Sequence, residues 1–535
     1  MKTKIALAQV NFFVGDVDGN ADKMIYYARQ AGLQKAQLVI FSELALSGYP
    51  PEDLLFRQSF HQKIKSAMPR LIAASADIDI ILGAPWLDNN NLYNALFYLS
   101  EGKILGYYAK QCLPNYGIFD EKRYFTRGDK PCVVQRHGLA MGLVVCEDLW
   151  HSGPAAQAYA AGADCLISIN ASPYDHYKPA QRLDILRQQQ LEAPLPIIYV
   201  QSVGAQDECV FDGGSLVLNK KGDVVLEAPY FTEGLSYIQY HGEKIVSLEE
   251  ESAAVSEESL MYDALRFGLY DYAEKNHFRD ALVGLSGGID SALTLTIACD
   301  ALGRDHVEAV LLPSRHTSDD SMALALEQVR LLGVKHRILS IEPIYEALLS
   351  TLGDHISTDE NDLTHQNLQA RARGILLMAL SNQTGNILLT TGNKSEMAVG
   401  YATLYGDMAG GFAVLKDVYK TWVYRLSRYR NQQQYVIPEK VITRAPSAEL
   451  APGQTDQDNL PPYDILDRIL EAYIEGEKSI DYIAATGFAS LDDINKVVKL
   501  LYRAEYKRRQ SAPGIKITTR AFGRERRYPI SQGFV

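Results

Sequence analysis

The sequence predicts an α/β protein made of two layered domains, and three observations support this. Apolar strand-like runs alternate with helix-like stretches up to about residue 240, an acidic stretch follows, and a second strand–helix alternation begins near residue 260. The chain has 535 residues, which is too many for one core, since a domain holds about 100–200 residues. We therefore expect domains at residues 1–245 and 261–535, joined by a linker at 246–260.

The N-terminal half has the pattern of a layered α/β domain. Short apolar runs predict buried strands, and the longer stretches between them predict helices. The expected strands span residues 5–10, 38–41, 78–83, 141–145 and 165–169, and the expected helices span residues 20–35 and 57–74.

The stretch between the two halves is acidic and poor in apolar residues. Residues 249–258 contain five glutamates among small side chains, which is typical of a linker. The alternative interpretation is the exposed start of a helix.

The C-terminal half has the rhythm of a doubly wound parallel sheet, in which strands and helices alternate. From about residue 461 the chain predicts short helices that end in a basic tail. The expected helices are 259–275, 290–302 and 319–332, and the expected strands are 281–285, 307–312, 336–340 and 386–390.

Composition excludes several classes of protein. The net charge of −12 argues against a nucleic-acid binder, which needs a basic face. We expect no membrane span, because the chain lacks an apolar run of about 18 residues. The N-terminus lacks the features of a signal peptide, so we expect a cytoplasmic protein. The six cysteines form no CxxC pair, so zinc binding, redox chemistry and a disulfide framework are weak interpretations.

A glycine-rich segment joins the strand at 281–285 to the helix at 290–302. Backbone N–H groups at such a helix start bind phosphate, and glycines let the backbone approach it. The segment lacks the Gly-Lys-Ser/Thr ending of a loop that handles γ-phosphate. A carboxylate here would repel phosphate unless it held Mg²⁺. The alternative is a capped glycine turn without a ligand. The expected ATP-binding residues are Gly284, Leu285, Ser286, Gly287, Gly288, Ile289, Asp290 and Ser291.

Ser-Gly-Gly-Ile-Asp-Ser at 286–291 resembles the signature of the ATP pyrophosphatases, which adenylate an oxygen of the substrate and release pyrophosphate. Four further segments are similar to NAD synthetases and narrow the acceptor to deamido-NAD. They are residues 367–373, 390–397, 400–407 and 446–456.

This resemblance implies roles for single residues. Thr391 matches a position that contacts ATP, and Asn367 and Glu396 match positions that contact deamido-NAD. Glu396 also matches a carboxylate near Mg²⁺, where it would pair with Asp290. Lys507 matches a basic residue near the phosphates or the adenylated carboxylate. Lys394 and Lys420 are further candidates for phosphate binding, and for each lysine the alternative is a solvated surface charge.

Cys146 follows an apolar strand and precedes two acidic residues, and such a cysteine alone is more often a packing residue. Two other segments change this interpretation. The segment around Cys146, together with residues 41–49 and 110–121, resembles the Glu-Lys-Cys triad of the nitrilase superfamily. The fold of this superfamily is an αββα sandwich. The resemblance implies Glu43 as general base, Lys110 as the neighbouring cation and Cys146 as nucleophile. A carboxylate can take the thiol proton, and an ammonium stabilises an oxyanion and favours thiolate.

The same resemblance implies glutamine as the source of ammonia. Tyr116, Ser172 and Lys178 match the glutamine-contacting positions of this family. The chain departs from the pattern at Gln201 and Ser202, where an Asn-containing segment is expected. This departure puts only local contacts in doubt.

Over residues 3 to about 530 the chain resembles the glutamine-dependent NAD synthetases. We expect glutamine, ATP and deamido-NAD to give glutamate, AMP, pyrophosphate and NAD. We also expect an ammonia tunnel and a homo-oligomer. Two alternatives remain: another amidotransferase of the ATP pyrophosphatase type, making GMP or asparagine, and a binding or sensor protein that has lost its chemistry.

Overall fold

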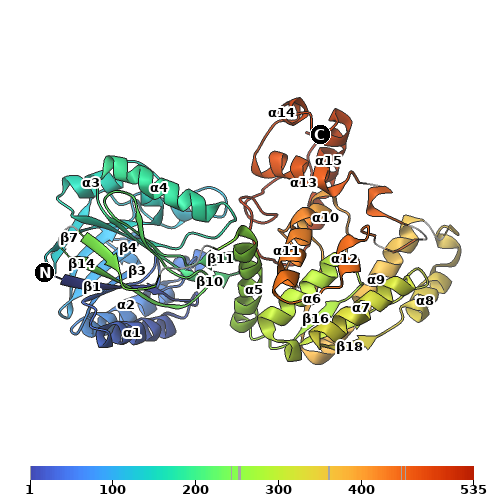
Figure 1. The fold of residues 1–535 in the computed structure, drawn as a ribbon, viewed down its shortest axis with the longest axis horizontal. Coiled ribbons are helices and arrows are strands. Elements are labelled where there is room, and N and C mark those ends of the chain that lie inside the picture. Colours follow the sequence, from blue (N-terminus) through green and yellow to red (C-terminus); the bar gives the residue numbers. More distant parts are fainter. Residues whose placement is uncertain are drawn as a thin grey trace. The chain divides into compact units, whose positions relative to one another are not determined.

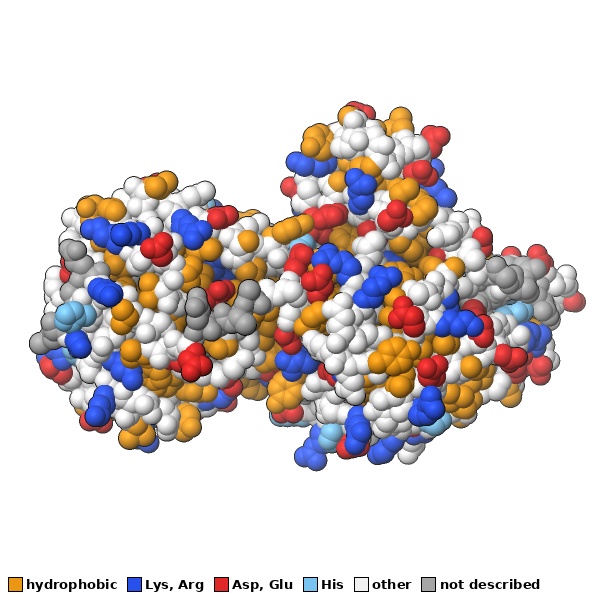
Figure 2. All heavy atoms as spheres, in the orientation of Figure 1, with side chains coloured by type: hydrophobic (Ala, Val, Ile, Leu, Met, Phe, Trp, Pro, Cys, Tyr) orange, Lys and Arg blue, Asp and Glu red, His pale blue; other side chains and the backbone are white. Residues whose placement is uncertain are grey.

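The computed structural model describes residues 2–241, 244–250, 255–359, 362–447, 449–451, 454–458 and 460–534. The chain divides into two compact units, Met1–Val255 and Ser256–Val535. None of the helices in this described part of the chain is long and apolar enough to cross a membrane. Figure 2 shows Lys and Arg side chains interspersed with Asp and Glu over the visible face.

The first unit contains two large sheets and one hairpin (Figure 1). The seven-stranded sheet has the order β15 (Lys244–Ser247), β14 (Gly234–His241), β1 (Lys2–Gln9), β2 (Leu38–Ile40), β3 (Asp79–Asp88), β4 (Asn91–Ser100) and β5 (Lys103–Ala109). The six-stranded sheet has the order β13 (Val224–Glu227), β12 (Leu216–Leu218), β9 (Ile197–Gln201), β8 (Cys165–Asn170), β7 (Leu139–Val145) and β6 (Cys132–Arg136). The hairpin pairs β10 (Val203–Gln206) with β11 (Cys209–Asp212).

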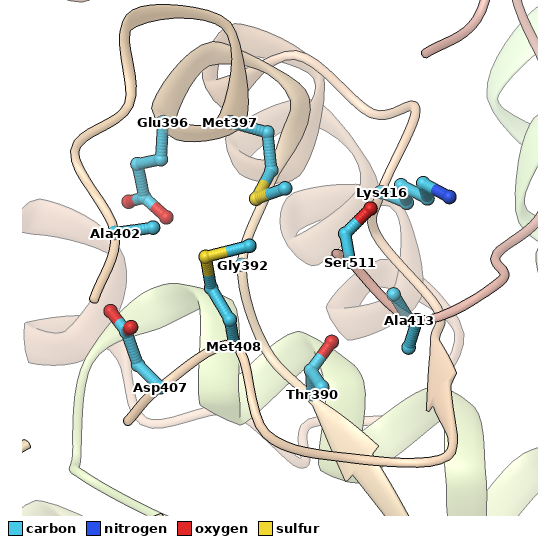
Figure 3. Close-up of a pocket in the computed structure, with 11 residues that line it drawn as sticks. Thr390, Gly392, Glu396, Met397, Ala402, Asp407, Met408, Ala413, Lys416 and Ser511 are labelled. Atoms are coloured by element: carbon cyan, nitrogen blue, oxygen red, sulfur yellow. The ribbon is translucent and has the colours of Figure 1, made fainter. Parts of the chain in front are cut away.

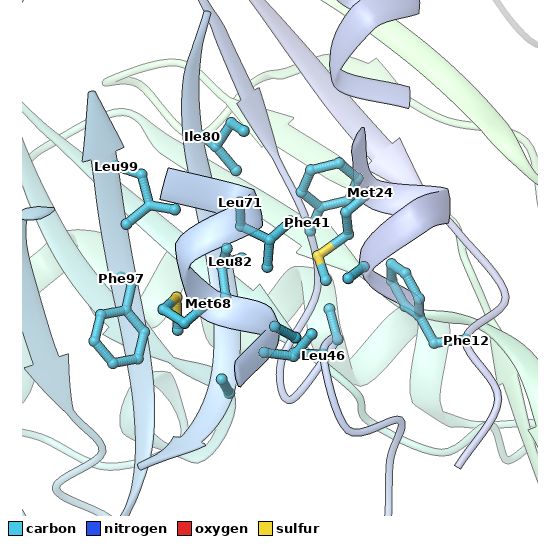
Figure 4. Packing of buried hydrophobic residues seen from close by; sticks show 14 of the residues in the cluster. Phe12, Met24, Phe41, Leu46, Met68, Leu71, Ile80, Leu82, Phe97 and Leu99 are labelled. Atoms are coloured by element: carbon cyan, nitrogen blue, oxygen red, sulfur yellow. The ribbon is translucent and has the colours of Figure 1, made fainter. Parts of the chain in front are cut away.

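Three apolar layers hold the first unit together, because alternate residues of each strand face opposite sides of their sheet. On β1, Ala6 and Ala8 belong to the cluster that packs on α1 (Val17–Leu33) and α2 (Gln58–Ala74). Figure 4 shows other members of this cluster, among them Met24 of α1 and Met68 and Leu71 of α2. Ile5 and Leu7 belong to the core between the two sheets. A third cluster packs the second sheet on α3 (Pro154–Ala160) and α4 (Lys178–Glu192). Short helical turns complete the unit: η1 (Glu52–Phe56), η2 (Glu121–Arg123) and η3 (Cys146–Leu149).

This order of layers is an αββα sandwich, as the sequence predicts. Each predicted strand and helix of this half corresponds to an observed element, because each has an apolar face that is buried. The predicted strand 78–83 extends further, to Asp88, since β3 pairs with β4 through to Asp88 and Asn91.

The second unit is built on a five-stranded parallel sheet. Its order reverses at β16, because β17 pairs on one side of β16 and β19 on the other. This is the doubly wound sheet that the sequence predicts. The order is β18 (Lys335–Ile338), β17 (Val307–Leu311), β16 (Ala281–Gly284), β19 (Ile387–Thr390) and β20 (Phe412–Ala413).

Helices surround this sheet and extend it with a helical C-terminal part. Leu282, Val310 and Leu388 pack on α9, and a second apolar cluster lies among α10, α13 and α15. The longer helices are α5 (Glu257–Lys275), α6 (Ile289–Leu302), α7 (Asp319–Leu332), α8 (Glu342–Leu352), α9 (Leu363–Thr384), α11 (Lys420–Gln433) and α15 (Leu491–Arg503). The shorter ones are η4 (Arg304–His306), η5 (Gly353–His355), α10 (Lys394–Val399), α12 (Glu439–Thr443), η6 (Asp456–Asp458), α13 (Tyr463–Leu470), η7 (Glu471–Glu475), α14 (Ile480–Ala485) and α16 (Glu505–Arg508).

The predicted linker at 246–260 overlaps an element at each end. Strand β15 continues to Ser247, and α5 begins at Glu257 with Ser256 as its N-cap. Glu257 and Glu258 lie in the first helical turn, where carboxylates interact favourably with the helix dipole. Residues 251–254 of the predicted linker lie outside the described residues.

Candidate active sites

Cys146 lies where strand β7 gives way to the helical turn η3. Its φ of 45° is in the left-handed region, which is rare for a residue with a side chain. Such a conformation costs free energy and is frequent where a side chain must be presented to a substrate. The side chain is 95% buried, and the apolar strand before it fixes its position.

Glu43 and Lys110 form a buried ion pair in the same unit. Lys110 Nζ lies 2.8 Å from Glu43 Oε1, and both side chains are almost fully buried. Asn94 Nδ2 donates to Glu43 Oε1 at 2.7 Å, and the Ala171 N–H donates to Oε2 at 3.1 Å. Glu43 therefore has a fixed orientation, with Lys110 and Asn94 at one oxygen and the backbone of Ala171 at the other.

A second carboxylate, from Glu121, completes this cluster. Lys110 Nζ also lies 2.8 Å from Glu121 Oε1, which Tyr49 contacts through its hydroxyl at 3.3 Å. Burial, opposed by Lys110 and assisted by Glu43, raises the pKa of Glu121 to about 7. The ammonium is thus shared by two buried carboxylates. Glu121 ends the segment 110–121, but the sequence pattern alone did not single it out.

The surroundings of Cys146 favour the neutral form of its thiol. Burial first, and next the Glu43 carboxylate, raise the pKa of the thiol well above its usual range. Lys110 lowers the pKa of the thiol, as expected, but its effect is smaller than the combined effect of burial and Glu43. Burial alone would lower the pKa of Lys110, but Glu121 and Glu43 hold it well above its ordinary value. A base must therefore take the thiol proton before Cys146 can attack.

Replacing Lys110 with methionine is expected to lower the free energy of unfolding by about 3–5 kcal/mol, because two carboxylates would stay buried without their cation. Urea unfolding followed by circular dichroism measures this loss. Lys23→Met is the matched control: Lys23 pairs with Glu233 at 3.6 Å and is 48% exposed. Its loss is expected to cost about 0–1 kcal/mol. Equal losses in the two variants would contradict the prediction.

Asp148 connects the segments that carry Lys110 and Cys146. Its Oδ1 accepts from the N–H groups of Gln111 and Cys112, at 3.1 and 2.7 Å. Its Oδ2 accepts from the Val145 N–H at 3.0 Å and from the Tyr108 hydroxyl at 2.8 Å. The side chain is fully buried. Since these donors lie within two residues of Lys110 or Cys146, Asp148 ties together the segments that carry them.

Two of the candidate glutamine residues, Tyr116 and Lys178, contact residues in or directly after the Cys146 turn. The Tyr116 hydroxyl donates to both oxygens of Glu147 at 3.0 Å. Lys178, the first residue of α4, lies with its Nζ 4.0 Å from the centre of the Trp150 ring. Ser172 is buried in the loop after β8. Sequence reasoning gave no role to Glu147 or Trp150, although Glu147 directly follows Cys146.

In the second unit, the glycine-rich segment makes the turn between β16 and α6. Ser291 Oγ donates to the Gly288 carbonyl at 3.0 Å and accepts from the Ser286 N–H at 3.2 Å, which closes the turn. Gly287 has a φ of 79°, and a Cβ there would lie 2.4 Å from the Ser321 carbonyl oxygen. Only glycine fits this position.

A cavity of about 270 Å³ opens in front of this turn. It lies between the ends of β16 and β19, where the strand order reverses, which is where ligands bind in doubly wound sheets. Its lining includes Thr391 and every residue of the 284–291 segment except Gly287. Arg373 and Arg444 also line it, and sequence reasoning did not single them out.

Asp290 and Glu396 converge on Lys420 at this cavity. Lys420 Nζ contacts Asp290 Oδ2 and lies 3.2 Å from Glu396 Oε1. Asn393 Nδ2 donates to Asp290 Oδ1 at 2.9 Å. Burial, together with Asp290 and Asp456 and against Lys420, raises the pKa of Glu396 to about 8. Two carboxyl groups thus share the ammonium of Lys420, and a bound cation would favour their charged forms.

A smaller pocket of about 20 Å³ reaches Glu396 as well, and this volume suffices for one water-sized molecule. Figure 3 shows the side chains of Met397 and Met408 pointing into it, with Glu396 and Asp407 on one side and Ser511 on the other.

Asn367 and Lys507, and also Lys394, lie outside the lining of the 270 Å³ cavity. Asn367 Oδ1 accepts from the Thr403 hydroxyl at 2.8 Å. Lys507 Nζ donates to the carbonyls of Gly400 and Ala402, at 2.8 and 2.7 Å.

Lys394, considered above as a phosphate partner, has a different environment. It is fully buried, and its Nζ lies 2.9 Å from Asp417 and 3.0 Å from Glu475. It also donates to the Thr518 hydroxyl at 2.7 Å. In this structure it therefore anchors the C-terminal segment, since these carboxylates neutralise its charge. The sequence could not distinguish it from Lys420, because the partners lie far along the chain.

Two family models match the chain, one in each half. The model of carbon-nitrogen hydrolases matches residues 4–248, and the model of NAD synthases matches residues 261–511.

Whole proteins match it over nearly their full length. The chain is 48% identical over 542 residues to the glutamine-dependent NAD(+) synthetase of Xanthomonas campestris pv. campestris, covering 99% of this chain and 98% of that protein. It is 46% identical over 535 residues to that of Acinetobacter baylyi, again covering 99% and 98%. A solved structure of the glutamine-dependent NAD(+) synthetase from Acinetobacter baumannii in complex with ADP superposes with a TM-score of 0.81 at 43% identity, covering 99% of this chain and 98% of that one. With both halves of its fold and almost all of its sequence shared, the chain belongs to the glutamine-dependent NAD(+) synthetases.

Proposed function

We propose that the first unit releases ammonia from glutamine at Cys146 and that the second unit uses ATP to amidate deamido-NAD. The observation that carries this proposal is the convergence of Asp290, Glu396 and Lys420 beside the glycine-rich turn. This arrangement concentrates charge where phosphates would bind, at the strand-order reversal of a parallel sheet.

In the glutaminase reaction, Glu43 takes the proton of the Cys146 thiol as sulfur attacks the amide carbon of glutamine. The raised pKa of the thiol makes this proton transfer necessary. Lys110 stabilises the oxyanion, and Glu43 returns the proton to the departing ammonia. Water then hydrolyses the thioester to glutamate. Glu121 keeps Lys110 charged through its 2.8 Å contact.

Glutamine binding is assigned to groups that border the Cys146 turn. Glu147 is buried and acidic, which suits the ammonium group of glutamine, and Tyr116 and His151 both contact its carboxylate. Lys178 is a cation suited to the carboxylate of glutamine, and Ser172 offers a hydroxyl from the loop after β8.

In the synthetase reaction, the nicotinate carboxylate attacks the α-phosphorus of ATP and pyrophosphate leaves. Ammonia then attacks the mixed anhydride, forming the amide and releasing AMP. N–H groups of the 286–291 turn bind the phosphates, and Thr391 and Lys420, which line the same cavity, contact ATP. The 20 Å³ pocket beside Glu396 has room for the attacking ammonia. Asn367, Glu396 and Lys507 are proposed to contact deamido-NAD.

Mg²⁺ is proposed to bind Asp290 and Glu396. Within the described residues, no group of three or more His, Cys, Asp or Glu side chains is arranged to hold a metal ion. This fits Mg²⁺, which is usually held by one or two carboxylates together with phosphate oxygens and water. Asp290 and Glu396 also lie close enough together for both to contact Lys420 Nζ. When bound, Mg²⁺ neutralises charge between the carboxylates and the phosphates.

An AMP-release assay with purified protein tests this function. We expect AMP only when deamido-NAD is present, with either glutamine or ammonium as nitrogen source. AMP formation with xanthosine monophosphate or aspartate, but not with deamido-NAD, would contradict the choice of acceptor. A lack of AMP with every acceptor would support a binding or sensor protein. The homo-oligomer, the ammonia tunnel, the cytoplasmic location and the lack of nucleic-acid binding stay predictions.

A further inference from the structure

Gln201, the last residue of β9, departs from the expected sequence pattern and is fully buried. Its carboxamide is paired with both backbone groups of Ser172. Gln201 Oε1 accepts from the Ser172 N–H at 3.2 Å, and Gln201 Nε2 donates to the Ser172 carbonyl. One side chain thereby makes the pair of bonds that a neighbouring strand would make.

A buried ion pair fixes the other side of this carboxamide. Gln201 Nε2 also donates to Asp212 Oδ1 at 3.2 Å. Arg182 Nη2 donates to both oxygens of Asp212, at 2.9 and 3.1 Å, and all three side chains are almost fully buried. The amide nitrogen must therefore face Asp212 and the Ser172 carbonyl, because both are acceptors. The orientation of the carboxamide is unique.

The loop that contains Ser172 connects Gln201 to the glutaminase site. Ala171, directly before Ser172, donates its N–H to Glu43 Oε2 at 3.1 Å. The loop is held on its other side by the Ser202 N–H, which donates to the Asn170 carbonyl at 3.0 Å. A shift of Ser172 would thus move a candidate glutamine contact and a hydrogen bond of the candidate base together.

We propose that Gln201 is a positioning residue for glutamine, acting through the Ser172 loop, with Asp212 and Arg182 fixing its orientation. The proposal rests on the glutaminase function proposed above. A purely structural role would require only burial and hydrogen bonding. A positioning role requires that substitution of Gln201 change the recognition of glutamine while the fold and the reactivity of the Cys146 thiol stay the same.

Gln201→Glu tests this with a side chain of the same shape. The substitution replaces a donor with an oxygen that faces Asp212 and the Ser172 carbonyl, so the loop must shift. We expect the KM for glutamine to rise by about tenfold or more, and kcat with glutamine to fall less than that. The kcat for synthesis from ammonium is expected to stay within about twofold, since that reaction does not use the loop.

Two covalent labels provide a second measurement. Iodoacetamide is small and reports the reactivity of Cys146, whereas a diazoketone analogue of glutamine must also occupy the glutamine site. In Gln201→Glu we expect the inactivation rate with the diazoketone to fall about tenfold, with the iodoacetamide rate changed much less. Glutamine-dependent activity of the unsubstituted protein that survives both labels would refute the glutaminase function itself rather than this proposal.

Gln190→Glu is the matched control. Gln190 is buried in the same unit and donates to the carbonyls of Leu195 and Asn219, at 2.8 Å each, away from Ser172. Gln201→Met removes the hydrogen bonds without adding charge, and serves if Gln201→Glu does not fold. An unchanged KM for glutamine in a folded Gln201 variant, or an equal rise in Gln190→Glu, would overturn the proposal.

Discussion

Replacing Cys146 with alanine is expected to abolish NAD synthesis from glutamine and to leave synthesis from ammonium nearly unchanged. The thiol is the proposed nucleophile, and loss of a nucleophile costs about 10³-fold or more in rate. Ammonium bypasses this step, because it supplies the nitrogen that the first unit would release. Initial rates of NAD formation with each nitrogen source measure the difference.

Cys165→Ala is the control for this experiment. Cys165 is fully buried on β8, in the core between the two sheets, and has no proposed role in the reaction. It should lose some stability and keep both activities. If Cys146→Ala lost both activities while its circular dichroism spectrum stayed native, the assignment of separate reactions to the two units would be wrong.

Replacing Asp290 with asparagine is expected to reduce synthesis from both nitrogen sources by about 10²–10³-fold, while glutamine hydrolysis continues. The substitution removes one of two carboxylates at Lys420 and one of the two proposed Mg²⁺ ligands. Adenylation precedes the attack of ammonia. Supplying ammonium in place of glutamine therefore cannot restore synthesis. AMP release and glutamate release, measured in parallel, separate the two reactions.

Asp300→Asn is the matched control, since Asp300 lies on the same helix, α6. Its carboxylate pairs with Arg430 at 2.6 Å, outside the lining of the cavity. It is expected to lower thermal stability and to retain AMP release. Full AMP release by the Asp290→Asn variant would show that Asp290 has no role in adenylation.

Local patterns predicted part of the fold, and strands such as β4, β6 and β9 were not predicted. The strands β1, β2, β7 and β8 are apolar runs that are buried on both faces, so their composition alone predicted them. The strand β18 is mostly exposed, and its prediction depended on its place after a helix. The hairpin β10–β11 escaped prediction because its residues show no clear alternation.

The candidate site residues followed from motifs, but their partners did not. Cys146, Glu43 and Asp290 stand at the ends of predicted strands or starts of predicted helices, where motifs are visible. Glu121 and Asp148 act on residues that are distant in sequence, and single charges of this kind carry no local signal. The sequence gives no reason to prefer Lys420 over Lys394.

By itself, the sequence determined the class of fold and the two kinds of chemistry, and it predicted the residues that carry them, because glycine turns, apolar strands and acidic motifs are local features. The tertiary structure decided how charges are distributed among those residues. It placed one ammonium between Glu43 and Glu121, and another between Asp290 and Glu396. The physical reason is that pairing and burial depend on which distant segments meet, and a buried charge is tolerated only where its partner lies within contact distance.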